Sequence, residues 1–126
     1  MQSVQTHTAK ISILKEGIVL LKFNDVVEYD EQNARINLET ESKLAGGVKY
    51  LSLVDCRCNL ITESKTHAFL ASEEAAKYRI AVAVLIETLA VRLSSRFYIS
   101  HYQPIVPTKI FTNEEEAKLW LLTFKK

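Results

Sequence analysis

The short sequence Asp-Cys-Arg-Cys, at positions 55–58, holds both cysteines of the chain between an acid and a base. It follows an apolar run over 50–54 that is typical of a buried β-strand. In α/β proteins the carboxyl end of such a strand is a common place for chemistry. A neighbouring arginine favours the thiolate form of a thiol, so Cys56 is a candidate nucleophile, with His67 as its candidate base.

The same cysteines have simpler interpretations. Cys56 and Cys58 are two residues apart, a spacing at which a mutual disulfide would be strained. A zinc site would need two further ligands, and the three histidines are scattered along the chain without metal-ligand spacing. We therefore expect no metal and no cofactor. Free cysteines are most often small, semi-buried residues, and this remains the alternative to a catalytic thiol.

The strands that would position these residues follow from hydrophobic alternation. Residues 11–23 predict a β-hairpin that turns at Gly17, and residues 24–30 are interpreted as an extension of its second strand. Further strands are expected over 48–55, 79–87 and 104–111. The run over 79–87 is continuously apolar, as in a central strand that is covered on both faces.

Helices are expected between these strands. The first follows Asp30, a candidate N-cap, and stops at the glycines of positions 46–47. One or two short helices are expected over 60–78, with Thr62 and Ser72 as caps. Two more are expected over 88–98 and 112–124, the last with Thr112 and Glu115 as a capping box.

The resulting order β-β-α-β-α-β-α-β-α predicts an α/β fold with a mostly parallel or mixed sheet, an N-terminal β-hairpin and about four helices. A length of 126 residues suits one domain, 1–126, in which we expect residues 1–8 to be a flexible N-terminal tail.

The composition excludes several classes of function. Hydrophobic residues make up 48% of the chain and charged residues 25%, which is typical of a globular protein. Sixteen basic and fifteen acidic residues give a net charge of +1, so we expect no nucleic-acid partner. The polar N-terminus predicts no signal peptide, and no apolar run reaches the roughly 18 residues of a membrane span. We expect a cytoplasmic protein.

Both this order of elements and the C-terminal sequence resemble the STAS superfamily, which includes sulphate transporter domains and anti-sigma-factor antagonists. The sequence is most similar to small bacterial SpoIIAA-like proteins of STAS or CRAL-TRIO type, over residues 11–124. In those proteins a pattern P-x-K-x-F-x-x-E-E-E-A-x-x-W-L closes the domain. The matching residues here are Pro107, Lys109, Phe111, Glu114, Glu115, Glu116, Ala117, Trp120 and Leu121.

This resemblance also bears on the cysteines. Anti-sigma-factor antagonists carry an Asp-Ser step at the strand end, and phosphorylation of that serine switches partner binding. Here Asp55 is present, but Cys56 stands where the serine would be. The resemblance therefore implies a regulatory or protein-interaction module without the phosphoacceptor serine.

Three functions are open as hypotheses. The first is a non-enzymatic, bacterial STAS-like module, expected as a homodimer with an unknown protein partner, whose interaction or switch loop would contain Asp55, Cys56, Arg57 and Thr62. The second, implied by the CRAL-TRIO likeness, is a small carrier of an apolar, lipid-like ligand, with a pocket lined by Phe69, Leu93, Phe97 and Tyr98. The third is a thiol-dependent enzyme that uses Cys56 with His67.

Overall fold

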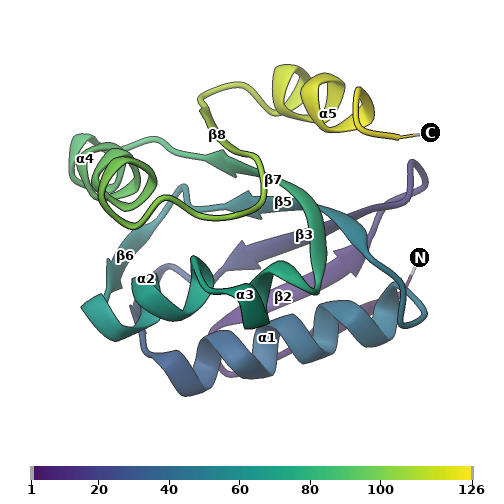
Figure 1. Cartoon of the computed structure of the whole chain (residues 1–126), viewed down its shortest axis with the longest axis horizontal. Coiled ribbons are helices and arrows are strands. Elements are labelled where there is room, and N and C mark those ends of the chain that lie inside the picture. Colours follow the sequence, from purple (N-terminus) through teal and green to yellow (C-terminus); the bar gives the residue numbers. More distant parts are fainter. Residues whose placement is uncertain (1, 126) are drawn as a thin grey trace.

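A six-stranded mixed sheet runs through the middle of the molecule (Figure 1). The computed structural model describes residues 2–125, apart from the side chain of residue 26. In sheet order the strands are β1 (Ser3–Gln5), β2 (Ala9–Ile13), β3 (Ile18–Phe23), β5 (Tyr50–Asp55), β7 (Arg79–Leu85) and β8 (Thr108–Phe111). The first three are antiparallel, and β3, β5, β7 and β8 are parallel. The predicted α/β class with a mixed sheet and an N-terminal hairpin is confirmed.

The N-terminal segment differs from the predicted flexible tail. Strand β1 pairs with β2, with Ser3 opposite Ser12 and Gln5 opposite Lys10. The side chains of β1 are exposed, so the segment lacks the apolar alternation that would reveal a strand in the sequence. Its pairing comes from backbone hydrogen bonds at the edge of the sheet.

A second, two-stranded parallel sheet is formed by β4 (Val26–Tyr29) and β6 (Asn59–Thr62). This corrects two predictions, because residues 24–30 do not extend β3 and residues 60–62 are not helical. Asn24 and Asp25 turn the chain out of β3, with the Asn24 N–H donating to the carbonyl of Thr8. In β6 half-buried and exposed side chains alternate, which is the two-residue period of a strand.

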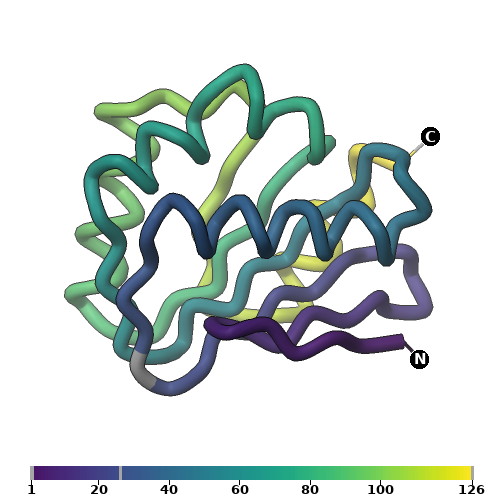
Figure 2. The backbone as a smooth tube through the Cα atoms, turned by 90° about the horizontal axis from the view of Figure 1, so that it is seen from below, coloured from purple at the N-terminus to yellow at the C-terminus, as the bar shows by residue number. Residues whose placement is uncertain are grey.

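Helices cover both faces of the large sheet. They are α1 (Glu31–Leu44), α2 (Ser64–Leu70), α3 (Glu73–Ala76), α4 (Leu89–Phe97) and α5 (Glu114–Leu122), and a π-helical turn η1 (Tyr98–Tyr102) continues α4. Helix α5 packs on β5 and β7, where Ala81 and Ala83 allow a close approach. Helix α1 lies across the opposite face (Figure 2). None of the helices in the described part of the chain is long and apolar enough to span a membrane.

Side-chain caps define where several helices begin. Asp30 accepts a hydrogen bond from the N–H of Asn33, and Ser72 accepts one from Ala75, so both predicted caps are confirmed. Thr62 is not a cap, because it ends β6 and α2 follows Glu63 without a side-chain cap. Helix α5 is capped by Asn113, one residue after the predicted Thr112.

Candidate functional site

At the carboxyl end of β5, Asp55 and Arg57 form a closed ion pair. The Asp55 carboxylate accepts hydrogen bonds from the backbone N–H and Nε of Arg57, both at 3.0 Å, and from Nη2 at 2.9 Å. Arg57 also reaches Glu114 at the start of α5, at 3.4 Å. Burial raises the pKa of Asp55, but the bonds from Arg57 lower it by more, so the pKa lies below its usual value. This carboxylate is therefore ionised and already satisfied within the chain.

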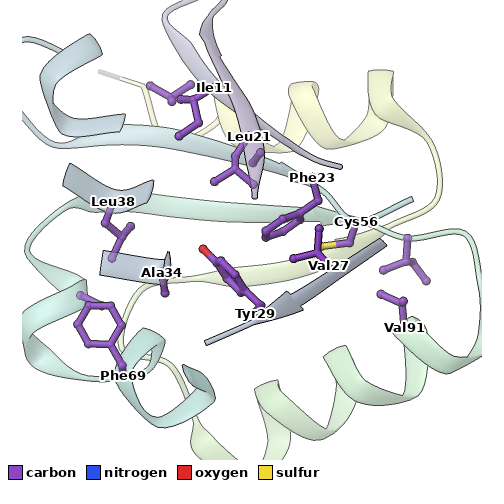
Figure 3. Packing of buried hydrophobic residues seen from close by; sticks show 14 of the residues in the cluster. Ile11, Leu21, Phe23, Val27, Tyr29, Ala34, Leu38, Cys56, Phe69 and Val91 are labelled. Carbon is purple, nitrogen blue, oxygen red and sulfur yellow. The ribbon is translucent and has the colours of Figure 1, made fainter. Parts of the chain in front are cut away.

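Cys56 points to the other side of the sheet. Its thiol lies in the hydrophobic core beside Phe23 and Val27 (Figure 3), and the residue is 4% exposed. Burial raises the pKa of Cys56 well above that of a free thiol, with smaller contributions from Cys58 and Asp55. A reactive thiolate is therefore strongly disfavoured at this position.

The structure divides the four residues of the predicted switch loop between the two faces of the sheet. Asp55 and Arg57 lie on the side of α5, whereas Cys56 and Thr62 line a cavity on the side of α1. His67 lines the same cavity from α2, and burial lowers its pKa.

This cavity is the most distinctive feature of the α1 side of the sheet. It has a volume of about 90 Å³ and lies between the sheet, α1, α2 and α4. Most of its wall is apolar, and polar side chains enter it from several elements. The lining residues are Leu21, Phe23, Tyr29, Leu38, Glu41, Val54, Cys56, Leu60, Thr62, His67, Leu70, Arg79, Val82, Val84, Val91, Ser94, Ser95, Tyr98, Ile99 and Thr108.

Glu41 and Arg79 make part of this wall charged, although both residues are buried. Arg79 is 6% exposed, and its Nε has no hydrogen-bond partner among the described residues. Glu41 is 2% exposed and lies 3.4 Å from the hydroxyl of Ser52. Burial raises the pKa of Glu41 to about 7, although the positive charge of Arg79 and the nearby hydroxyl groups of Tyr50 and Ser52 oppose the shift. The carboxyl can thus change charge near neutral pH.

A β-bulge aims Arg79 into the cavity. Tyr50 of β5 pairs with Arg79, but the next residue, Leu51, pairs with Ala81, so that Ile80 is an extra residue in β7. In a regular strand Arg79 would share the face of Ala81, which packs against α5. The bulge turns the Arg79 side chain to the opposite face of the sheet. Bulges beside functional sites often change the direction of a side chain in this way.

Of the four residues predicted to line an apolar pocket, only Tyr98 lines this cavity within the described chain. Phe69 is buried elsewhere in the core, where the guanidinium of Arg35 lies 4.2 Å from its ring centre. Leu93 and Phe97 point outward from α4. The pocket prediction is thus corrected for these three residues, because the face of α4 that meets the cavity carries Val91, Ser95 and Tyr98.

Sequence reasoning did not select Glu41 and Arg79 as site residues. A signal was present for Glu41, which shares the helical spacing of the apolar residues Ala34 and Leu38 and so had to be buried. For Arg79 the signal was its position at the start of an apolar strand. The bulge that orients it could not be seen in the sequence.

The outer face of α4 carries an exposed apolar stripe formed by Leu89, Leu93 and Phe97, which are 69%, 57% and 52% exposed. These residues are four apart and therefore share one face of the helix. Arg92 and Arg96, also on α4, line a surface groove with Lys109 of β8. Glu116 of α5 also lines this groove, so three basic side chains and one acidic side chain lie beside the stripe and their net charge is positive.

An aromatic cluster closes the C-terminal end of α4. Phe97 stacks on His101 with ring centres 4.8 Å apart, and His67 of α2 lies 5.1 Å from Tyr98. The cluster coincides with the π-helical turn η1, a structure that is rare and found frequently at functional sites.

Comparison with known proteins identifies a family. The family model named "Domain of unknown function (DUF7793)" matches residues 12–125. The chain belongs to this family. No curated protein matches this DUF7793 chain.

Solved structures are similar to the DUF7793 chain at low sequence identity. One is the crystal structure of an uncharacterised protein from the DUF3478 family of Shewanella loihica PV-4, which has a SpoIIAA-like fold. Its TM-score is 0.64 at 15% identity, covering 96% of this chain and 99% of that chain. The chain therefore has a SpoIIAA-like fold. A protein of unknown function from Arthrobacter sp. FB24 matches at 21% identity over 95% of this chain and 97% of that chain, with a TM-score of only 0.35.

Proposed function

We propose that this DUF7793 chain is a non-enzymatic, STAS-like regulatory module that binds a protein partner through the outer face of α4. The observation that carries the proposal is the stripe of Leu89, Leu93 and Phe97, three large apolar side chains that are more than half exposed on one helix face. Contiguous exposed apolar surface of this kind commonly marks a protein-interaction site.

The charges around the stripe indicate what kind of partner fits it. Arg92 and Arg96 lie on the same helix, and Lys109 lies beside them, with Glu116 as the one acidic residue of the groove, so the net charge here is positive. A symmetric contact between two copies uses the same patch on both, so an antiparallel α4–α4 contact would bring positive rims together. A different protein with an apolar centre and an acidic rim is the complementary partner.

The strand end supports a mode of action without a phosphorylation switch. Cys56 stands where the resemblance to anti-sigma-factor antagonists places a phosphorylated serine, and it is buried. Because Asp55 is satisfied by Arg57, the loop presents little unpaired charge to a partner. In this proposal the module acts in the bacterial cytoplasm, where its two free cysteines stay reduced.

The two other hypotheses have weaker support. A thiol enzyme would need an ionisable Cys56, and burial raises the pKa of that thiol. A lipid carrier would need a pocket of roughly 300–1,000 Å³, as is usual for sites of drug-sized ligands. The cavity, at about 90 Å³, is much smaller.

Quantitative affinity capture from the producing host tests the proposal with three baits. These are the wild type, Leu93→Glu and, as a matched control, Leu119→Glu. Leu119 is a comparably exposed leucine (65%) on a different helix, α5. We expect a protein captured by the wild type to be depleted at least tenfold with Leu93→Glu and retained with Leu119→Glu, since a buried charge at an apolar contact is costly.

The same proteins, studied by analytical ultracentrifugation, separate a hetero-partner from a homodimer. A monomeric wild type agrees with the acidic-partner proposal. A wild-type dimer that Leu93→Glu dissociates would show that α4 binds a second copy instead. If Leu93→Glu changes neither the captured proteins nor the oligomeric state, the proposal is wrong.

A further inference from the structure

The cavity beside α1 contains the guanidinium of Arg79, a permanent positive charge that lies in the field of Glu41 and whose Nε has no hydrogen-bond partner among the described residues. Arg79 is more than nine-tenths buried, and within residues 2–125 its Nε meets no hydrogen-bond acceptor. Buried guanidinium groups are normally paired, because leaving their donors unsatisfied is costly. The bulge at Ile80 turns this side chain toward the cavity and away from α5. A guanidinium that the fold holds in the wall of a cavity indicates that the cavity binds a ligand with an anionic group.

The rest of the wall indicates that an apolar group is attached to that anion. Val82 and Val84 of β7 lie on the same side of the sheet as Arg79, and Leu38 and Leu70 face them from helices α1 and α2. A volume of about 90 Å³ is small. Since one water needs roughly 10–15 Å³ on this measure, the cavity fits a molecule of about six to nine heavy atoms.

We propose that this cavity binds a short-chain monocarboxylate, with its carboxylate on the Arg79 guanidinium and its apolar tail against Val82 and Val84. The planar guanidinium of an arginine can donate two parallel hydrogen bonds to the two oxygens of a carboxylate. These charge-assisted hydrogen bonds are stronger than hydrogen bonds between neutral groups. This inference concerns the inner side of α4 and goes beyond the proposed protein contact on its outer side.

Glu41 adds to the selectivity of the site. Its carboxyl lies in the field of Arg79, and Tyr50 and Ser52 of β5 are its other polar neighbours. When protonated, Glu41 can donate a hydrogen bond to a bound carboxylate, whereas the ionised form repels it. The positions of Glu41 and Arg79 thus favour an anion over a cation once Glu41 is neutral.

Titration by two-dimensional ¹⁵N–¹H NMR tests the site with isobutyrate as the probe. Isobutyramide is the matched ligand control, since it has the same shape without the charge. We expect isobutyrate to cause saturable shifts at Arg79, Ser95 and Tyr98, and to bind at least tenfold more tightly than isobutyramide. Equal binding of both compounds, or no saturable shift with isobutyrate at millimolar concentration, would overturn the proposal.

Variants locate the binding. Arg79→Met should weaken isobutyrate binding at least tenfold, whereas Arg96→Met, which removes an exposed arginine of α4, should leave it unchanged. Ser95→Leu fills the cavity while keeping Arg79, and should also abolish binding. If Arg79→Met does not fold, Ser95→Leu still tests whether isobutyrate binds in this cavity. Isobutyrate binding that survives Ser95→Leu would place the ligand elsewhere and overturn the proposal.

Discussion

Glu41 is a carboxyl group that folding removes from water and places near a cation without forming a close ion pair. Burial raises its pKa from 4.5 to about 7, and Arg79 only partly opposes this shift. The folded state therefore holds a proton that the unfolded state has already released between these two pH values. A group of this kind stabilises the fold at low pH and destabilises it as the pH rises.

We predict that Glu41→Gln removes this pH dependence. In the wild type, the contribution of Glu41 to the free energy of unfolding is fully present below about pH 4.5 and is lost as the pH rises to about 7. The shift corresponds to a loss of about 3 kcal/mol. Urea unfolding of both proteins from pH 4 to 8 measures the difference between them, in which other titrating groups cancel. If the difference in the free energy of unfolding between the wild type and Glu41→Gln stays constant with pH, the raised pKa of Glu41 is contradicted.

Asn37 shows how one helix is fixed to the sheet. Its side chain is 1% exposed and bonds three hydroxyl groups: it accepts from Thr6 at 2.7 Å and donates to Thr8 at 3.0 Å and to Tyr29 at 3.1 Å. Thr6 and Thr8 lie in the turn between β1 and β2, and Tyr29 ends β4. A single amide thus connects α1 to the β1–β2 turn and to strand β4.

Replacing this amide should loosen α1. Asn37→Ala leaves several buried hydroxyl groups without their partner, so we predict a loss of about 2 kcal/mol or more in the free energy of unfolding. The matched control is Gln32→Ala, which removes an exposed amide from the same helix and should change stability by less than about 0.5 kcal/mol. Urea denaturation checks both, and equal effects of the two substitutions would refute this role of Asn37.

The elements differ in how far the sequence could predict them. Strands with buried apolar runs and helices with an apolar face, such as β7 and α5, were visible because their own residues carry the period. Strands β4 and β6 are four residues long and pair across more than thirty positions, so local patterns did not distinguish β6 from a helix start. The cap at Asn113 in place of Thr112 is a shift of one residue, which a pattern does not resolve.

The candidate site was harder to predict than the fold. The two cysteines were candidate reactive groups in the sequence, but Cys56 is buried in the core and neither cysteine forms a disulfide. The charged pair that does face a cavity, Glu41 and Arg79, comes from two elements separated in the chain. Its placement depends on a bulge and on the packing of α1, and both are tertiary features.

On the scale of the whole molecule, α4 separates two surfaces of different character. Its inner side meets the cavity through Val91, Ser95 and Tyr98, and its outer side presents Leu89, Leu93 and Phe97 to solvent. An α/β domain with a satisfied strand end and an unpartnered helix face is suited to binding. We therefore expect the outer face of α4 to contact another protein.

Site-specific photo-crosslinking in the producing host tests this contact most directly. A photoreactive amino acid is placed at position 93 on α4 or, as the matched control, at position 119 on α5, since both positions hold exposed leucines. We predict a crosslinked protein at position 93 that is absent at position 119 and whose contact site, mapped by mass spectrometry, is apolar with acidic neighbours. Identical crosslinks at both positions, or none at position 93, would contradict the proposed contact.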